Sequence, residues 1–173
     1  MRVLKVFYSA LSAWERGDKD KAILMMTGGR DDPTDYELYG RKIHEEICDK
    51  KWKPFEWMDD SCEYEVKLDV KILPWLKVTG RLDLRHLEKQ KILDWKTGIS
   101  SSTSFKPMQL YVYDLLNYKM TGVKCKEGYL VKVLKFKKLE MEDYSIYKLN
   151  DETRQKALDW IEGIASEMYN ELI

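Results

Sequence analysis

The clearest pattern in the sequence is a strict alternation of apolar and charged side chains over residues 62–72. Apolar or cysteine side chains fill the even positions, and the odd positions hold Glu63, Glu65, Lys67, Asp69 and Lys71. Because successive side chains of a β-strand point to opposite faces, this alternation predicts a strand with one buried and one solvated face. Two further strands are predicted at 76–85 and 91–97, separated by turns at 74–75 and 87–90, so the three segments should form an antiparallel meander.

Helical spacing predicts the elements that precede this meander. Residues 3–7 are expected to be extended, and helical turns are expected over 9–14 and 18–26, before a turn-rich loop. Over 36–48 one apolar stripe recurs at helical spacing and predicts a helix; it consists of Tyr36, Tyr39, Ile43 and Ile47.

A similar pattern follows the meander. Pro107 is suited to the start of a helix that reaches about residue 120, and strands are predicted at 126–136 and 139–149. Asn150 or Asp151 should cap a last helix, whose apolar stripe is Ala157, Ile161, Ile164, Met168 and Leu172. This order of elements predicts an α/β (mixed α+β) domain in which helices flank a central mixed sheet.

The composition fits one domain. The 173 residues are 44% hydrophobic, which is enough to bury a full core. We expect an N-terminal helical segment (1–35), a core that carries the chemistry (36–149) and a C-terminal helix (150–173). The 30 basic and 30 acidic residues cancel, so a protein that coats duplex DNA by bulk positive charge is disfavoured.

The cysteines and the uncharged runs bear on the compartment. Cys48, Cys62 and Cys125 form no CxxC pair, which argues against a disulfide or zinc framework and favours a reducing, cytoplasmic setting. Uncharged runs reach only nine residues, too few to span a bilayer, so no membrane contact is expected.

Two carboxylates on the second hairpin are the main candidates for chemistry. Leu82, Leu84, Leu93 and Trp95 can share one apolar face only in certain registers, and a turn centred between residues 88 and 89 pairs Leu84 with Leu93. In that register Leu82 faces Trp95, and Asp83 faces Asp94. Like charges placed opposite each other are destabilising, so the pair suggests a divalent cation between two oxygen ligands. A solvated strand face carrying these charges by chance is the alternative.

Other polar residues lie at spacings that suit the same site. Lys96 projects on the same side as the two acids, where an ammonium group can hold a water molecule or stabilise charge on a phosphate. His44 lies beside the apolar stripe of its helix, and Gln109 and Tyr113 share one helical face. Taken singly, a histidine at such a position is more often structural than a ligand, and an exposed polar pair explains Gln109 and Tyr113 equally well.

Taken in order, these residues resemble a known family. Gly40-x3-His44, Gly80-x2-Asp83, Asp94-x-Lys96 and Gln109-x3-Tyr113 are similar to the motifs of RecB-type nucleases of the PD-(D/E)xK superfamily. The resemblance covers about residues 39–113, and more loosely 9–14. It implies a restriction-endonuclease-like core, with a three-stranded antiparallel meander in the central sheet.

The resemblance also implies an activity and a set of roles. It implies a metal-dependent nuclease in which His44, Asp83, Asp94 and the carbonyl of Trp95 bind Mg²⁺ or Mn²⁺. Lys96 would orient the attacking water, while Gln109 and Tyr113 fix the site or contact the strand. Related nucleases hold an iron–sulfur cluster with one upstream and three downstream cysteines; here only Cys125 follows residue 113, so no cluster is expected.

DNA, single-stranded or at an end, is the expected partner. A lysine-rich stretch including Lys135, Lys137 and Lys138, together with Arg81 or Arg85, is the candidate phosphate contact, and Tyr111 or Tyr113 the candidate for stacking. A solvated strand edge explains the lysines equally well. The leading hypothesis is a RecB-like exonuclease acting in repair, recombination or mobile-element processing. The alternatives are an endonuclease or RNA-cleaving relative, and a non-catalytic binding adaptor. The sequence contains no P-loop motif, so any helicase motor would have to come from a helicase or recombination partner. A homo-oligomer is also compatible with each hypothesis.

Overall fold

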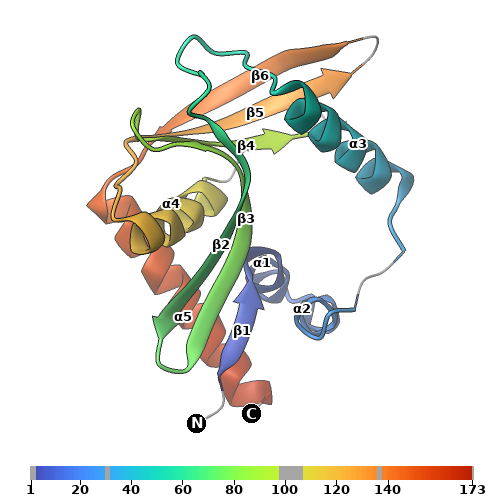
Figure 1. Cartoon of the computed structure of the whole chain (residues 1–173). Coiled ribbons are helices and arrows are strands. Elements are labelled where there is room, and N and C mark those ends of the chain that lie inside the picture. The colour runs from blue at the N-terminus through green and yellow to red at the C-terminus, as the bar shows by residue number, and fades with distance from the viewer. Residues whose placement is uncertain (1–2, 30–31, 98–106, 136–137, 173) are drawn as a thin grey trace.

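A computed structural model describes residues 3–29, 32–97, 107–135 and 138–172, and shows the expected mixed α/β architecture (Figure 1). The helices of this part of the chain are α1 (Tyr8–Glu15), α2 (Lys19–Met26), α3 (Asp35–Lys50), α4 (Met108–Thr121) and α5 (Asp151–Leu172). The strands are β1 (Leu4–Phe7), β2 (Glu63–Leu73), β3 (Leu76–His86), β4 (Lys91–Lys96), β5 (Glu127–Lys135) and β6 (Leu139–Lys148). Each element lies within a few residues of its sequence-based prediction.

The strands form one mixed sheet in the order β1-β3-β4-β5-β6, with β2 on the other edge of β3. The long β2–β3 ribbon is antiparallel, and β1 is parallel to β3 through residues 76–79. Farther along the same edge, residues 84–86 of β3 pair with β4, and Leu84 faces Leu93 as predicted. Residues 80–83 of β3 therefore pair with neither β1 nor β4. This gap is where the candidate chemistry gathers.

Helices cover both faces of the sheet, and the β2–β3 ribbon passes from one apolar core to the other. Leu82 and Val66 pack in the core with α1, α4 and α5, whereas Leu84 and Tyr64 pack with α3. Trp95 also belongs to the α3 core. The prediction that Leu82 faces Trp95 on one shared apolar surface is therefore wrong: the two side chains lie in different cores, and the β3–β4 ladder ends at Leu84–Leu93.

The helix ends follow ordinary capping chemistry. α3 begins with a capping box between Thr34 and Glu37, and the Asn150 side chain accepts a hydrogen bond from the Thr153 N–H at the start of α5. The predicted stripe of α5 is buried except for Leu172, which is 39% exposed. The stripe that predicts α3 is buried at Ile43 and Ile47, whereas Tyr36 at its start is 70% exposed. No helix within the described residues is both long and apolar enough to cross a bilayer.

Candidate metal centre

One imidazole and two carboxylates meet beside the gap in β3. His44 from α3 lies with Nδ1 3.6 Å from Glu65 Oε1 and 3.7 Å from Asp83 Oδ1. One ligand atom from each of these three side chains lies within 4.8 Å of the others. Carboxylate oxygens suit divalent cations such as Mg²⁺ and Mn²⁺, and imidazole nitrogen is a common metal ligand. The donor set and its spacing therefore fit a metal centre.

Glu65 is the member of this group that the sequence analysis missed. It lies between the ladder pairs Tyr64–Leu84 and Val66–Leu82, so Asp83 is its cross-strand neighbour on β3. Its φ is 53°, in the left-handed region that costs a side-chain-bearing residue about 1–3 kcal/mol. The alternating pattern showed a charged residue on the solvated face of a strand. It held no sign that the backbone turns this carboxylate toward His44.

Asp83 is the most strongly perturbed acid of the site. Only 8% of the residue is exposed, and its Oδ2 accepts a hydrogen bond of 2.6 Å from the Trp95 N–H. Burial and the nearby Asp94 charge raise its pKa well above 3.8, against the opposing effects of His44 and the Trp95 N–H. The two acids are thus close, although the ladder pairs of β3 and β4 end at Leu84–Leu93 and do not include them.

The other two titratable groups shift toward their charged forms. Burial lowers the pKa of His44, but the combined effect of Glu65, Asp83 and Asp94 outweighs it and leaves the pKa raised. A hydrogen bond to His44 lowers the pKa of Glu65 despite partial burial. In the absence of metal, the imidazolium of His44 therefore acts as the counter-charge to the carboxylates.

A second set of side chains links β4 to α4. Lys96 Nζ lies 2.5 Å from Asp94 Oδ2, an ion contact without hydrogen-bond geometry, and donates a hydrogen bond of 2.6 Å to Gln109 Oε1. Gln109 Nε2 in turn donates to the Tyr113 hydroxyl at 3.2 Å. The structure thus brings together four residues that the sequence analysis assigned to one site. Tyr113 is 6% exposed, so its ring is not available for stacking on a base.

Two glycines let these elements approach closely. A Cβ at Gly80 would lie 2.8 Å from Cε1 of Tyr113, and a Cβ at Gly40 would lie 2.6 Å from Oγ1 of Thr97. Gly80 therefore admits the Tyr113 ring against β3, and Gly40 admits the end of β4 against α3.

Replacing Gly80 by alanine should displace Tyr113 and thereby disturb the hydrogen bond to Gln109. We expect the free energy of unfolding to fall by about 1–3 kcal/mol, the usual cost of overpacking. Gly163→Ala is the matched control, because a Cβ there meets nothing within 4 Å on α5. The control should raise the stability by up to about 1 kcal/mol. Urea unfolding of both variants tests this, and equal effects would contradict the role given to Gly80.

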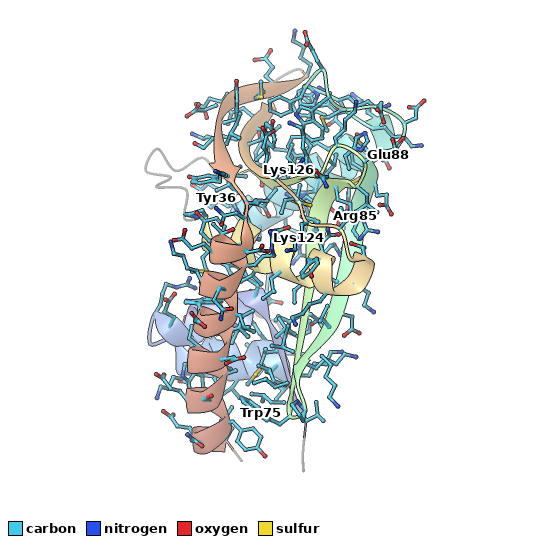
Figure 2. The ribbon with its side chains drawn as sticks, turned by 90° about the vertical axis from the view of Figure 1, so that its left-hand side faces the viewer. Tyr36, Trp75, Arg85, Glu88, Lys124 and Lys126 are labelled. Atoms are coloured by element: carbon cyan, nitrogen blue, oxygen red, sulfur yellow. The ribbon has the colours of Figure 1, made fainter. Side chains whose placement is uncertain are left out.

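The two arginines proposed as phosphate contacts differ in exposure and in their partners. The Arg81 side chain is 72% exposed and lies 3.3 Å from Glu65. Arg85 is only 12% exposed; it donates two hydrogen bonds to the Glu63 carboxylate and one to Asn117 of α4. Figure 2 shows Arg85 and Lys124 near the same end of α4. Arg85 therefore has intramolecular partners, whereas most of the Arg81 side chain is open to solvent.

The remaining sequence candidates are Tyr111 and three lysines of the region around β5 and β6. Tyr111 is partly buried in the core with α5, and the exposed Lys138 lies 3.9 Å from Glu140. Lys137 lies outside the described residues, as does the side chain of Lys135. Their proposed contacts with DNA stay predictions. Cys48, Cys62 and Cys125 are free thiols.

Comparison with solved structures identifies the class of fold. No protein-family model matches the sequence, and a search of curated proteins finds no match either. The architecture is that of a nuclease fold shared with exonuclease structures. An Eubacterium rectale protein proposed to be an exonuclease aligns with a TM-score of 0.64 and 14% identity, over 97% of this chain and 80% of that one.

Two further structures agree. LHK-Exo in complex with dAMP aligns with a TM-score of 0.60 and 13% identity, over 98% of this chain and 90% of that one. A phage-related exonuclease from Haemophilus somnus aligns with a TM-score of 0.50 and 12% identity, over 99% of this chain and 97% of that one. At these identities the likeness establishes the fold, and it is consistent with the RecB-like motifs in the sequence.

Proposed function

We propose that this chain is a divalent-metal-dependent nuclease of the PD-(D/E)xK type that hydrolyses phosphodiester bonds in DNA. Within that class, we propose a RecB-like exonuclease that acts on single strands or DNA ends. The observation that carries the proposal is the convergence of His44, Glu65 and Asp83 beside the Asp94–Lys96 pair, at the gap in β3. The exonuclease fold of the structural neighbours supports the same activity.

The residues of the site fit a divalent metal. Asp83 is buried beside the like charge of Asp94, whose Oδ2 has Lys96 as its ion-pair partner. A buried carboxylate beside a like charge is unfavourable unless further positive charge offsets it, and a metal ion would supply that charge. His44, Glu65, Asp83 and Asp94 would hold the metal, with the Trp95 carbonyl as a further ligand. When bound, the metal supplies charge neutralisation at the phosphate and makes water more acidic.

The other residues have complementary roles in this proposal. Lys96 holds the attacking water with its ammonium group and places positive charge beside the reacting phosphate. Gln109 fixes the position of Lys96 through the hydrogen bond to its ammonium group, and Tyr113 fixes Gln109 in turn. Because the Tyr113 ring is packed against Gly80, this chain of contacts is anchored in β3 as well as in α4.

A cleavage assay tests the proposal. We expect the purified protein to degrade linear single-stranded or duplex DNA in Mn²⁺ or Mg²⁺ and to be inactive in EDTA. Circular DNA should be spared if the enzyme is an exonuclease. Lys96→Ala should reduce cleavage by at least about 100-fold, the usual effect of losing a positioned proton-transfer or charge-stabilising group. The assay measures product release from end-labelled and internally labelled substrates.

The same assay separates the alternatives. Cleavage of circles would indicate an endonuclease, and cleavage of RNA alone would identify the RNA-cleaving relative. Lys156→Ala is a suitable control, because this lysine pairs with Glu152 on α5 and lines neither of the two hollows. If the wild-type protein cleaves neither DNA nor RNA with any divalent ion, the nuclease proposal is wrong and the adaptor remains.

A further inference from the structure

Two hollows lie next to each other along α3. The larger, about 920 Å³, is lined by the metal group His44, Glu65 and Asp83. The smaller, about 340 Å³, is lined by residues of the α1–α2 region such as Ser9, Lys21 and Gly29. Glu37 and Arg41 line both hollows, so the two form one continuous path that leads away from the metal group.

Tyr36 lies beside this path with its ring in solvent. It is on the first turn of α3, lines the larger hollow and is 70% exposed, the highest value among the exposed large apolar residues. Tyr36, Gly40 and His44 are spaced by four residues, so they share one face of the helix. At 1.5 Å per residue, Tyr36 lies about 12 Å along the helix from His44. A few nucleotides span that distance.

The two ends of this path carry different charged residues. Beyond His44 toward the end of α3, the larger hollow is lined by the acids Glu45 and Asp49. In the other direction are Arg41 and, in the smaller hollow, Lys21. Glu37 is the acid between these two cations. Hydrogen bonds from Thr34 lower its pKa most, and the charges of Lys21 and Arg41 lower it further. Arg81 also lines the larger hollow and lies near Cys48. A polyanion is therefore attracted by Arg41 and Lys21 on the Tyr36 side, whereas on the other side Glu45 and Asp49 offset the attraction of Arg81.

We propose that Tyr36 and Arg41 form a subsite for single-stranded nucleic acid, in which Tyr36 stacks on an unpaired base and Arg41 contacts a phosphate. The inference rests on the proposed nuclease function and names its substrate class. Stacking on a protein ring requires an open base face, which a single strand offers and the interior of a duplex does not. The subsite thus selects a strand or a frayed end that leads into the metal group.

Fluorescence anisotropy in EDTA tests the stacking contact without cleavage. The probe is a labelled oligothymidylate of about ten nucleotides, which is within the usual site size. Tyr36→Ala should weaken binding about 5- to 150-fold, as expected for one lost base–aromatic stack, and Tyr36→Phe should bind like wild type. Tyr144→Ala is the control, because Tyr144 is 45% exposed on β6, away from the two hollows. It should bind like wild type.

The salt dependence tests the phosphate contact. Arg41→Gln should reduce the slope of log K against log salt by about 0.7, the value for one phosphate contact with a single strand. Lys42→Gln removes an exposed charge from the same helix that lines neither hollow, and should leave the slope unchanged. An unchanged slope for Arg41→Gln, or one equal to that of Lys42→Gln, would overturn the contact.

The outcomes separate this inference from the proposed function. If the wild type cleaves DNA but Tyr36→Ala binds the oligonucleotide within twofold of wild type, the subsite is wrong and the nuclease stands. An equal loss of affinity for blunt duplex also overturns the subsite. If Tyr36→Ala loses single-strand binding while the wild type shows no cleavage in Mn²⁺, the subsite stands and the nuclease proposal fails.

Discussion

Asp83→Asn should abolish cleavage and, at the same time, make the metal-free protein more stable. The Asp83 carboxylate belongs to the metal group and also accepts the hydrogen bond from the Trp95 N–H. Because a bound metal supplies several kcal/mol of charge stabilisation, we expect the loss of this ligand to reduce cleavage at least about 1,000-fold. Asparagine keeps the shape and can still accept the Trp95 N–H bond. It removes only the buried charge beside Asp94.

The sign of the stability change follows from the raised pKa of Asp83. Below the ordinary value of 3.8, Asp83 is protonated in both the folded and the unfolded protein, and the two sequences should differ little. As the pH rises toward the raised folded value, the unfolded chain releases a proton that the folded protein holds. The wild type therefore loses stability relative to the variant, and the loss increases further as His44 deprotonates.

Melting temperatures measure this difference directly. Between about pH 4 and about pH 8, the advantage of Asp83→Asn should grow with pH, and 1 kcal/mol corresponds to about 2–4 °C in a domain of this size. Added Mn²⁺ should stabilise the wild type by about 2.7 kcal/mol at 100 times Kd and the variant much less. Adding metal should thus reduce the difference in stability between the two proteins or reverse its sign. A variant that is less stable than the wild type at every pH would contradict the account of Asp83.

Metal uptake should itself depend on pH. The ligands bind a cation in their deprotonated forms, and the pKa values of both His44 and Asp83 are raised in the metal-free protein. Affinity measured by calorimetry should therefore weaken as the pH falls through these values, with proton release on binding. Glu65, whose pKa is lowered, is already ionised and adds little to this dependence.

The sequence was sufficient for the parts of the structure that follow from local periodicity. The alternation over 62–72 and the polar turn at 87–90 predicted the meander and the Leu84–Leu93 register. The spacing of Gln109 and Tyr113 predicted a shared helical face, and both residues join the Lys96 network. In each case the relevant neighbours are close in sequence or are related by a strand period of two.

The errors arose where long-range geometry overrides periodicity. Leu82 and Leu84 have the same strand parity but pack in different cores, so the side-chain period of two does not assign both to one apolar face. Glu65 joins the metal group through a left-handed backbone conformation that no pattern of residue types encodes. Tyr36 has the spacing of a core residue but lies at the exposed start of α3. Two of these three departures place residues at the proposed site, as expected where function competes with local preference.

Breaking the buried ion pair between Asp114 and Arg154 should destabilise the fold more than any other single charge deletion that we consider. Asp114 of α4 is fully buried, and Arg154 of α5 lies 2.5 Å from it. The Cys125 N–H also donates to Asp114, so the carboxylate joins α4, α5 and the segment before β5. Without Asp114, the buried Arg154 keeps, among the described residues, only the exposed Asp151 and the Cys125 carbonyl as hydrogen-bond partners. Removing one partner of a buried ion pair typically costs about 3–5 kcal/mol, so Asp114→Ala should lower the melting temperature by roughly 6–12 °C or more.

Two comparisons make this prediction specific. Lys124→Ala removes one of the two cationic partners of the exposed Asp151, which keeps Arg154, and should cost less than about 1 kcal/mol. The double variant Asp114→Leu, Arg154→Met replaces both charges by apolar groups and should be more stable than Asp114→Ala, because neither buried charge remains. Since Asp114 follows Tyr113 on α4, the loss of the pair should also loosen the helix that holds Gln109 against Lys96. The prediction fails if the free energies of unfolding of Asp114→Ala and Lys124→Ala differ by less than about 1 kcal/mol. In that case the buried pair does not fix α4, and the rigidity of the Lys96 network must come from the contact of Tyr113 with Gly80 alone.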